Sequence, residues 1–71
     1  MMVSFANWMA MVNKETLVFT NGEYDADDLG DTIDLYDLWE CAVTPKEAAG
    51  ALLEDNGNAE LVPEKYRNII C

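Results

Sequence analysis

Carboxylates are the side chains in this sequence that could do chemistry, and they concentrate between residues 23 and 40. This segment reads EYDADDLGDTIDLYDLWE; an acid recurs at every third position, and no Lys, Arg or His interrupts the series. Repeated carboxylates can chelate a metal ion, act as general acid and base, or present negative charge to a basic partner. The acids at the three-residue spacing are Asp25, Asp28, Asp31, Asp34, Asp37 and Glu40.

The first half of the segment matches part of an EF-hand calcium loop. Asp25, Asp27 and Gly30 occupy positions 1, 3 and 6 of that pattern, where the glycine allows a sharp turn. Position 5 is Leu29, which offers no side-chain oxygen, and position 12, which should be a bidentate glutamate, is Tyr36. We therefore predict no specific metal site and no cofactor, and only weak screening of the acidic charge by Ca²⁺ or Mg²⁺.

A catalytic use of these carboxylates is not expected. The chain has no histidine and its one serine is Ser4, so it offers no serine–histidine pair. No glycine-rich phosphate-binding loop follows a predicted strand. Acid–base catalysis by paired carboxyls needs one of them to have a raised pKa inside a cleft, and a domain of 71 residues has little volume for a cleft. We predict a protein that is not an enzyme.

The overall charge favours the third use, an acidic surface for a basic partner. Fourteen acidic residues against four basic ones give a net charge of −10 and a pI near 4.1. Between Lys14 and Lys46 there are nine acids and no base. Such a block repels nucleic acid and anionic membranes and attracts basic protein surfaces. Direct binding to DNA, RNA or a membrane is therefore not expected.

Carboxylates at this density can imitate a nucleic acid. On a helix, residues three or four apart lie about 5–6 Å from one another at Cβ, which is on the scale of the spacing between phosphates. Small acidic inhibitors that phages and mobile elements direct against host nucleases, restriction enzymes or CRISPR effectors work by such mimicry, and the chain is similar to that class in size and charge. We predict a nucleic-acid-mimicking inhibitor of anti-CRISPR or anti-restriction type. Its predicted contact residues are Asp25, Asp27, Asp28, Asp31, Asp34, Asp37 and Glu40, with Tyr24 and Tyr36 at the rim.

Two alternatives stand beside this prediction. Surface acids commonly do no more than keep a protein in solution. In the other alternative, the chain is a small structural or adaptor subunit that self-associates through an apolar N-terminal helix. Phe5, Trp8, Met9 and Val12 have the spacing of one helix face, and a homodimer would form through the first three of them.

A small β-hairpin is predicted to precede the acidic helix. Residues 16–20 are β-branched and aromatic, and Asn21-Gly22 comes directly after them. A strand that ends in Asn-Gly is the strongest short-range signal for a hairpin turn. Residues 23–26 would form the short return strand.

Three helices are predicted after the hairpin. The first covers residues 32–43 and carries its acids on the side opposite its apolar residues. Residues 44–47, Thr-Pro-Lys-Glu, form a capping box that begins the second, and residues 55–58, Asp-Asn-Gly-Asn, end it. Pro63 begins a last short helix.

These elements predict one domain over residues 1–71, of the α+β class and mainly α, with three to four short helices packed around one small β-hairpin. A chain this short buries only about 60% of its unfolded surface, so we expect marginal stability. Its first 14 residues lack an early positive charge and a small-residue cleavage site, and they are too short to span a bilayer. Cys41 and Cys71 have no metal-binding spacing, so we expect a reducing, cytoplasmic setting, while a disulfide between the two stays open.

Overall fold

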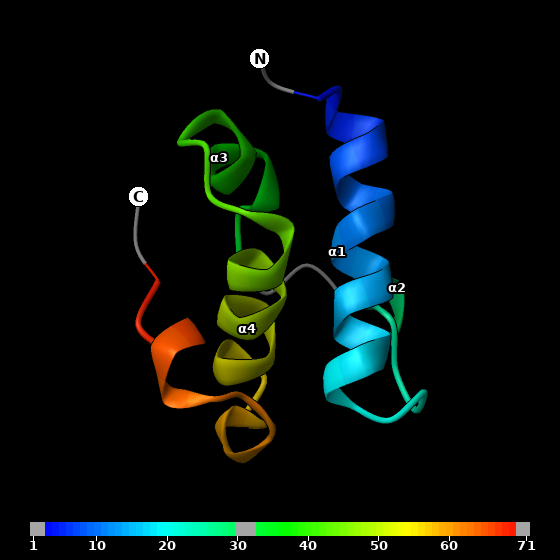
Figure 1. Ribbon diagram of the computed structural model, residues 1–71, viewed down its shortest axis with the longest axis vertical. Helices are drawn as coiled ribbons and strands as arrows, with labels where there is room; N and C mark the ends of the chain where they lie inside the picture. The colour runs from blue at the N-terminus through cyan, green and yellow to red at the C-terminus, as the bar shows by residue number, and fades with distance from the viewer. Residues whose placement is uncertain (1–2, 30–32, 70–71) are drawn as a thin grey trace.

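The chain folds as short helices packed against one longer N-terminal helix. The computed structural model describes residues 3–29 and 33–69. In order they form α1 (Phe5–Phe19), α2 (Ala26–Leu29), α3 (Leu35–Glu40), α4 (Pro45–Asp55) and two short 3₁₀ helices, η1 (Ala59–Leu61) and η2 (Glu64–Tyr66). Helices α1 and α4 lie side by side, and α3 lies beside the N-terminal half of α1 (Figure 1).

The prediction of an α+β fold is wrong, because the part of the chain that the structure describes contains no strand and no hairpin. The expected first strand, residues 16–20, is the end of α1 and its C-cap. Trp8, Val12 and Thr16 are buried at spacings of four residues, so the helical period continues into the β-branched stretch. The Thr16 hydroxyl donates to the Val12 carbonyl at 2.8 Å, which satisfies this buried polar group within the helix. The fold is all-α.

Asn-Gly closes α1 instead of turning a hairpin. Asn21 and Gly22 have φ values of 55° and 83°, the left-handed conformation that a hairpin turn would also need. Here the Gly22 N–H donates to the Leu17 carbonyl at 2.7 Å, and the Asn21 N–H to the Val18 carbonyl at 3.3 Å. These two bonds are the Schellman motif of helix ends. The expected return strand, residues 23–26, instead leads into α2.

Helix α4 begins and ends as predicted. The Glu47 N–H donates to Thr44 Oγ1 at 3.2 Å, and the Thr44 N–H donates to Glu47 Oε1 at 3.1 Å, which completes the capping box. A second Schellman motif ends the helix, with Gly57 at a φ of 84° and the Asn58 N–H on the Leu53 carbonyl at 2.9 Å.

Helix α3 is present but shorter than the predicted range, residues 32–43. Its N-cap is Asp34, and its C-cap is Cys41. A third Schellman motif follows, in which Ala42 has a φ of 61° and the Val43 N–H donates to the Leu38 carbonyl at 3.1 Å. The predicted last helix is the single turn η2, with Pro63 as its N-cap.

The core lies between α1 and α4. Val12 of α1 and Leu52 and Leu53 of α4 are fully buried. The indole N–H of Trp8 donates to the Val43 carbonyl at 3.0 Å and so ties α1 to the α3–α4 turn. Gly50 lets the C-terminal segment rest directly on α4, because a Cβ there would lie 2.6 Å from the Tyr66 carbonyl oxygen.

The structure bears on two predictions: that no segment spans a membrane, and that the chain lies in a reducing compartment. No helix among residues 3–29 and 33–69 is both long and apolar enough to cross a membrane. Cys41 is disulfide-bonded, which weighs against the expected reducing setting, since disulfides are rare in the cytosol. Cys71, the other half of the disulfide that the sequence left open, lies outside the described residues.

Candidate functional site

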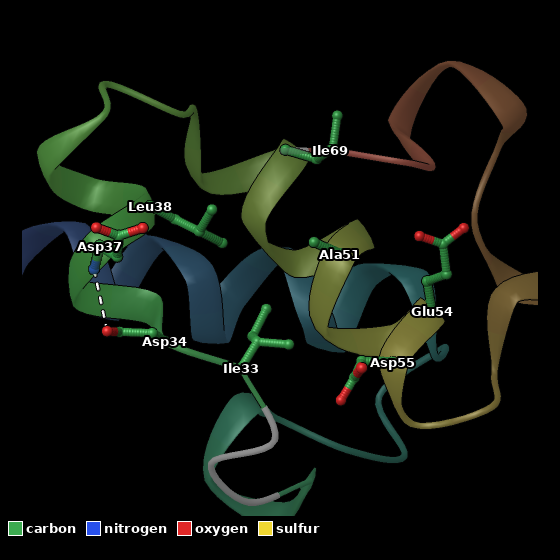
Figure 2. A pocket seen from close by; sticks show the side chains of 8 residues that line it. All are labelled: Ile33, Asp34, Asp37, Leu38, Ala51, Glu54, Asp55 and Ile69. Carbon is green, nitrogen blue, oxygen red and sulfur yellow. Dashed lines mark hydrogen bonds between the residues drawn. The ribbon is translucent and has the colours of Figure 1, made fainter. Parts of the chain in front are cut away.

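Carboxylates of α3 and α4 surround one hollow of about 600 Å³, which we call the acidic hollow. Figure 2 shows Asp34 and Asp37 on one side of it and Glu54 and Asp55 on the other, with Ile33, Leu38 and Ala51 between the two pairs. The described residues that line it are Ile33, Asp34, Asp37, Leu38, Ala51, Glu54, Asp55 and Ile69.

The start of α3 positions the first pair of carboxylates. Asp34 is the N-cap, and its Oδ1 accepts the Asp37 N–H at 3.1 Å, the bond dashed in Figure 2. Both residues are exposed, while the neighbouring Leu35 and Leu38 are buried and hold the helix on the core. An acid at the N-cap and in the first turn also suits the positive end of the helix dipole. Helix stability therefore accounts for this pair.

Helix stability does not account for the second pair. Glu54 and Asp55 are the last two residues of α4, where the helix dipole favours bases and disfavours acids. Glu54 is half-buried, and its Oε1 accepts the Asn68 N–H at 3.1 Å, which fixes the side chain and the C-terminal segment to each other. Asp55 is exposed. Glu54 and Asp55 add negative charge on the side of the hollow opposite Asp34 and Asp37, so the hollow is acidic on both sides.

The chemistry of the hollow suits a cationic side chain. Its apolar residues can contact the aliphatic stem of a Lys or Arg, and carboxylates can accept the N–H groups at the tip. None of the lysines or arginines that the structure describes lines the hollow. Nor do residues 3–29 and 33–69 contain a group of three or more His, Cys, Asp or Glu arranged to hold a metal ion.

The carboxylates near α2 have a different role. Asp25 Oδ1 accepts the Asp28 N–H at 2.9 Å, and Asp28 Oδ2 accepts the Asp25 N–H at 3.1 Å, so the two form a reciprocal cap. The Ala26 N–H donates to Asn13 Oδ1 on α1 at 3.1 Å. The sequence that resembles half of a calcium loop thus forms a short capped helix, while its Gly30 lies outside the described residues.

The structure brings together only part of the predicted contact surface. Asp34 and Asp37 line the acidic hollow, whereas Asp25, Asp27, Asp28 and Glu40 are not among its described lining residues. Asp31 lies outside the described part of the chain.

Both predicted rim tyrosines are accessible. Tyr24 is 43% exposed and Tyr36 is 51% exposed. Tyr36 packs its ring against Phe5 and Trp39, with centroids 5.1 and 5.2 Å away, so it extends an aromatic group from α1 to the surface beside Asp34.

Sequence reasoning missed Glu54 and Asp55. The capping box fixes the phase of α4, so the spacing of Ala51, Glu54 and Asp55 could have placed them together on one side of that helix. Their meeting with α3 depends on how the two helices pack, which no local pattern encodes.

The lysines gather away from the hollow. Lys46 Nζ lies 3.9 Å from Glu15 Oε1 and 5.8 Å from the centre of the Tyr66 ring, and Lys65 Nζ lies 5.1 Å from the same ring. Lys14 and Lys46 line one shallow pocket between α1 and the start of α4. The described lysines therefore leave the carboxylates of the acidic hollow without a lysine among their lining neighbours.

No family model, curated protein or solved structure matches the chain.

Proposed function

We propose that this protein is a non-enzymatic inhibitor that binds the basic surface of a nucleic-acid-binding protein in place of nucleic acid, with the acidic hollow at the centre of the contact. The observation that carries the proposal is one hollow lined by four acidic residues, two at the start of α3 and two at the end of α4, with apolar residues between the two pairs. Inhibitors of restriction or CRISPR enzymes encoded by phages or mobile elements are the class it fits.

The hollow would take Lys or Arg side chains that normally contact phosphates. An arginine with its stem over Leu38 and Ala51 would direct its guanidinium to carboxylates such as Asp37 and Glu54, and charge-assisted bonds of this kind are the strong ones. The net charge of −10 would steer the encounter, so association should be fast and should slow steeply as salt is added.

The cytoplasm, where such targets act, is the location that goes with this proposal. The structure has Cys41 in a disulfide, and disulfides are rare in the cytoplasm, so the redox state of Cys41 in the cell tests this location. Alkylation of a fresh lysate before reduction, followed by mass spectrometry of the Cys41 peptide, distinguishes the two forms.

The test for the target is capture from the cells in which the protein acts. Immobilised protein should retain basic nucleic-acid-binding proteins and release them to duplex DNA and to moderate salt, because DNA and the acidic hollow compete for one surface. Retention that persists in excess duplex DNA and in 1 M salt would contradict the proposal, since an electrostatic contact is screened under those conditions.

The test for the hollow uses an oligoarginine peptide and two variants of equal charge. The hollow variant carries Asp37→Asn, Glu54→Gln and Asp55→Asn, and it leaves the N-cap Asp34 intact. The control carries Glu23→Gln, Glu60→Gln and Glu64→Gln, all at exposed positions outside the lining. Isothermal titration calorimetry measures the affinity of each variant for the peptide. The hollow variant should bind the peptide about tenfold more weakly than the control, because it loses three partly exposed ion pairs with the arginines. Equal loss in both variants would show that only net charge matters.

A further inference from the structure

The outward side of α1 is mostly apolar, and its fully exposed residues include no carboxylate. Met11, Leu17 and Val18 are 43%, 38% and 60% exposed, and they belong to the most exposed large apolar side chains of the described residues. The turns of the helix place them away from the buried Val12 and Thr16, with Met11 at the edge next to Trp8. We call this surface the α1 face; its residues, all exposed, are Ala6, Asn7, Ala10, Met11, Lys14, Leu17 and Val18.

An uncharged groove continues the α1 face toward α3. It is lined by Val3, Trp8 and Met11 on the α1 side and by the α3–α4 turn on the other, and none of its described lining residues is charged. Met11 belongs to both surfaces, so the α1 face and this groove form one connected apolar region.

We propose that the α1 face is an interface between two copies of this chain. Two molecules with a net charge of −10 repel each other wherever their acids meet. On the α1 face that repulsion is smallest, because its one charged residue is Lys14, and at its edge the carboxylate of Glu15 is paired with Lys46 at 3.9 Å. The acidic hollow is lined by α3 and α4, so it stays clear of the contact.

The alternative occupants fit this surface less well. A basic partner is drawn to the acidic hollow, whereas the α1 face carries Lys14 and the one carboxylate at its edge, Glu15, is already paired with Lys46. An anionic membrane would be repelled by the net charge. A second copy needs no complementary charge or special binding group. In a symmetric dimer the apolar side chains of one copy contact the same side chains of the other. This interface does not depend on the function proposed for the acidic hollow.

The size of the α1 face predicts a weak dimer. A 15-residue helix is about 22 Å long, which places the contact at the low end of interface areas, below about 1,200 Å² in total. We therefore expect dissociation constants of about 10 µM or weaker. Salt should strengthen the dimer, because it screens the repulsion between the two acidic bodies while leaving apolar contact intact.

Sedimentation velocity of the intact protein tests this proposal, over about 10 µM to 1 mM protein and in low and high NaCl. The measured mass should move from one chain toward two as protein and salt increase. Val18→Glu should weaken the dimer at least tenfold, because it places a carboxylate on the α1 face of both copies. The control Leu61→Glu adds the same charge at an exposed apolar residue of η1 and should leave the dimer unchanged.

Three outcomes would overturn the proposal. One is a single-chain mass at every concentration and salt. Another is equal weakening by Val18→Glu and Leu61→Glu, which would mean that added charge alone opposes association. The third is a Val18→Glu dimer as strong as the unmodified one. Circular dichroism confirms that each variant keeps its helices, and Val18→Gln replaces Val18→Glu if the glutamate disturbs the end of α1.

Discussion

Helix α1 and the acidic segment, residues 23–40, are both helical, but different interactions stabilise them. Helix α1 has 15 residues, an uncharged N-cap at Ser4 and no acid in its first turn; it is held by burying one side against α4. Helices α2 and α3 have four and six residues, too short to be stable by themselves. Carboxylates cap their first turns, and the buried Ala26, Leu35 and Leu38 attach them to the core.

This difference changes the meaning of the acidic segment. Asp25, Asp28 and Asp34 accept backbone N–H groups at the starts of α2 and α3. Their frequency therefore reflects helix capping as well as surface charge. The three-residue spacing of the acids arises partly from capping. In a capping box the N-cap residue and its hydrogen-bond partner are three positions apart. Counting acids alone overstates how many of them are present for a partner.

The largest expected effect comes from removing burial on α1. Trp8→Ala should lower the free energy of unfolding by about 3–5 kcal/mol, because it empties a buried site and deletes the indole hydrogen bond to Val43. Urea denaturation followed by circular dichroism measures this loss. Met11→Ala, on the exposed side of the same helix, should change stability by less than about 0.5 kcal/mol. Similar losses in the two variants would mean that burial does not distinguish the two sides of α1.

Removing a carboxylate cap should have a smaller effect. Asp34→Ala should cost about 1 kcal/mol, because the Asp37 N–H loses its acceptor. Asp34→Asn removes the charge but keeps an oxygen acceptor, so its stability should stay close to that of the unmodified protein. Thermal unfolding of the two variants at one salt concentration separates them. If Asn is as costly as Ala, then the charge of Asp34, rather than its hydrogen bond, stabilises α3.

Neutralising the acids around the hollow should have the smallest effect and the opposite sign. Glu54→Gln and Asp55→Asn together should raise stability by a few tenths of a kcal/mol at low salt, because the dipole of α4 disfavours both acids and their repulsion with the start of α3 falls. The gain should disappear at about 0.5 M NaCl, where the Debye length is only a few ångströms. A loss of stability at low salt would show that these carboxylates contribute to holding α3 on α4.

The fold could be predicted where one local interaction decides an element. The capping box at Thr44 and Glu47 marked the start of α4, and the glycine at position 57 marked its end. Residues 16–20 misled because Asn21-Gly22 encodes a left-handed backbone, and that conformation serves a hairpin turn and a helix end equally. The continued four-residue spacing from Trp8 was the clue that favoured a helix.

The candidate site could be predicted only by half. An amphipathic α3 was enough to place Asp34 and Asp37 on an exposed side. The other half comes from Glu54 and Asp55, about twenty residues further along the chain. Which helix end packs beside α3 is set by the shape of the whole core, including the close approach of the C-terminal segment at Gly50. That information is not contained in any short stretch of sequence.

The three Schellman motifs that end α1, α3 and α4 bear on how fast the chain can fold. Each reverses the backbone within a few residues and brings segments that are near in sequence together, but the main core contact joins α1 to α4, which are separated by α2 and α3. Chains dominated by such local contacts cross small entropic barriers and fold in microseconds to milliseconds, whereas strand pairing between distant segments is slower. This chain combines both kinds of contact: its three helix-ending turns can form quickly, whereas the α1–α4 core forms only after the chain between the two helices has closed on itself.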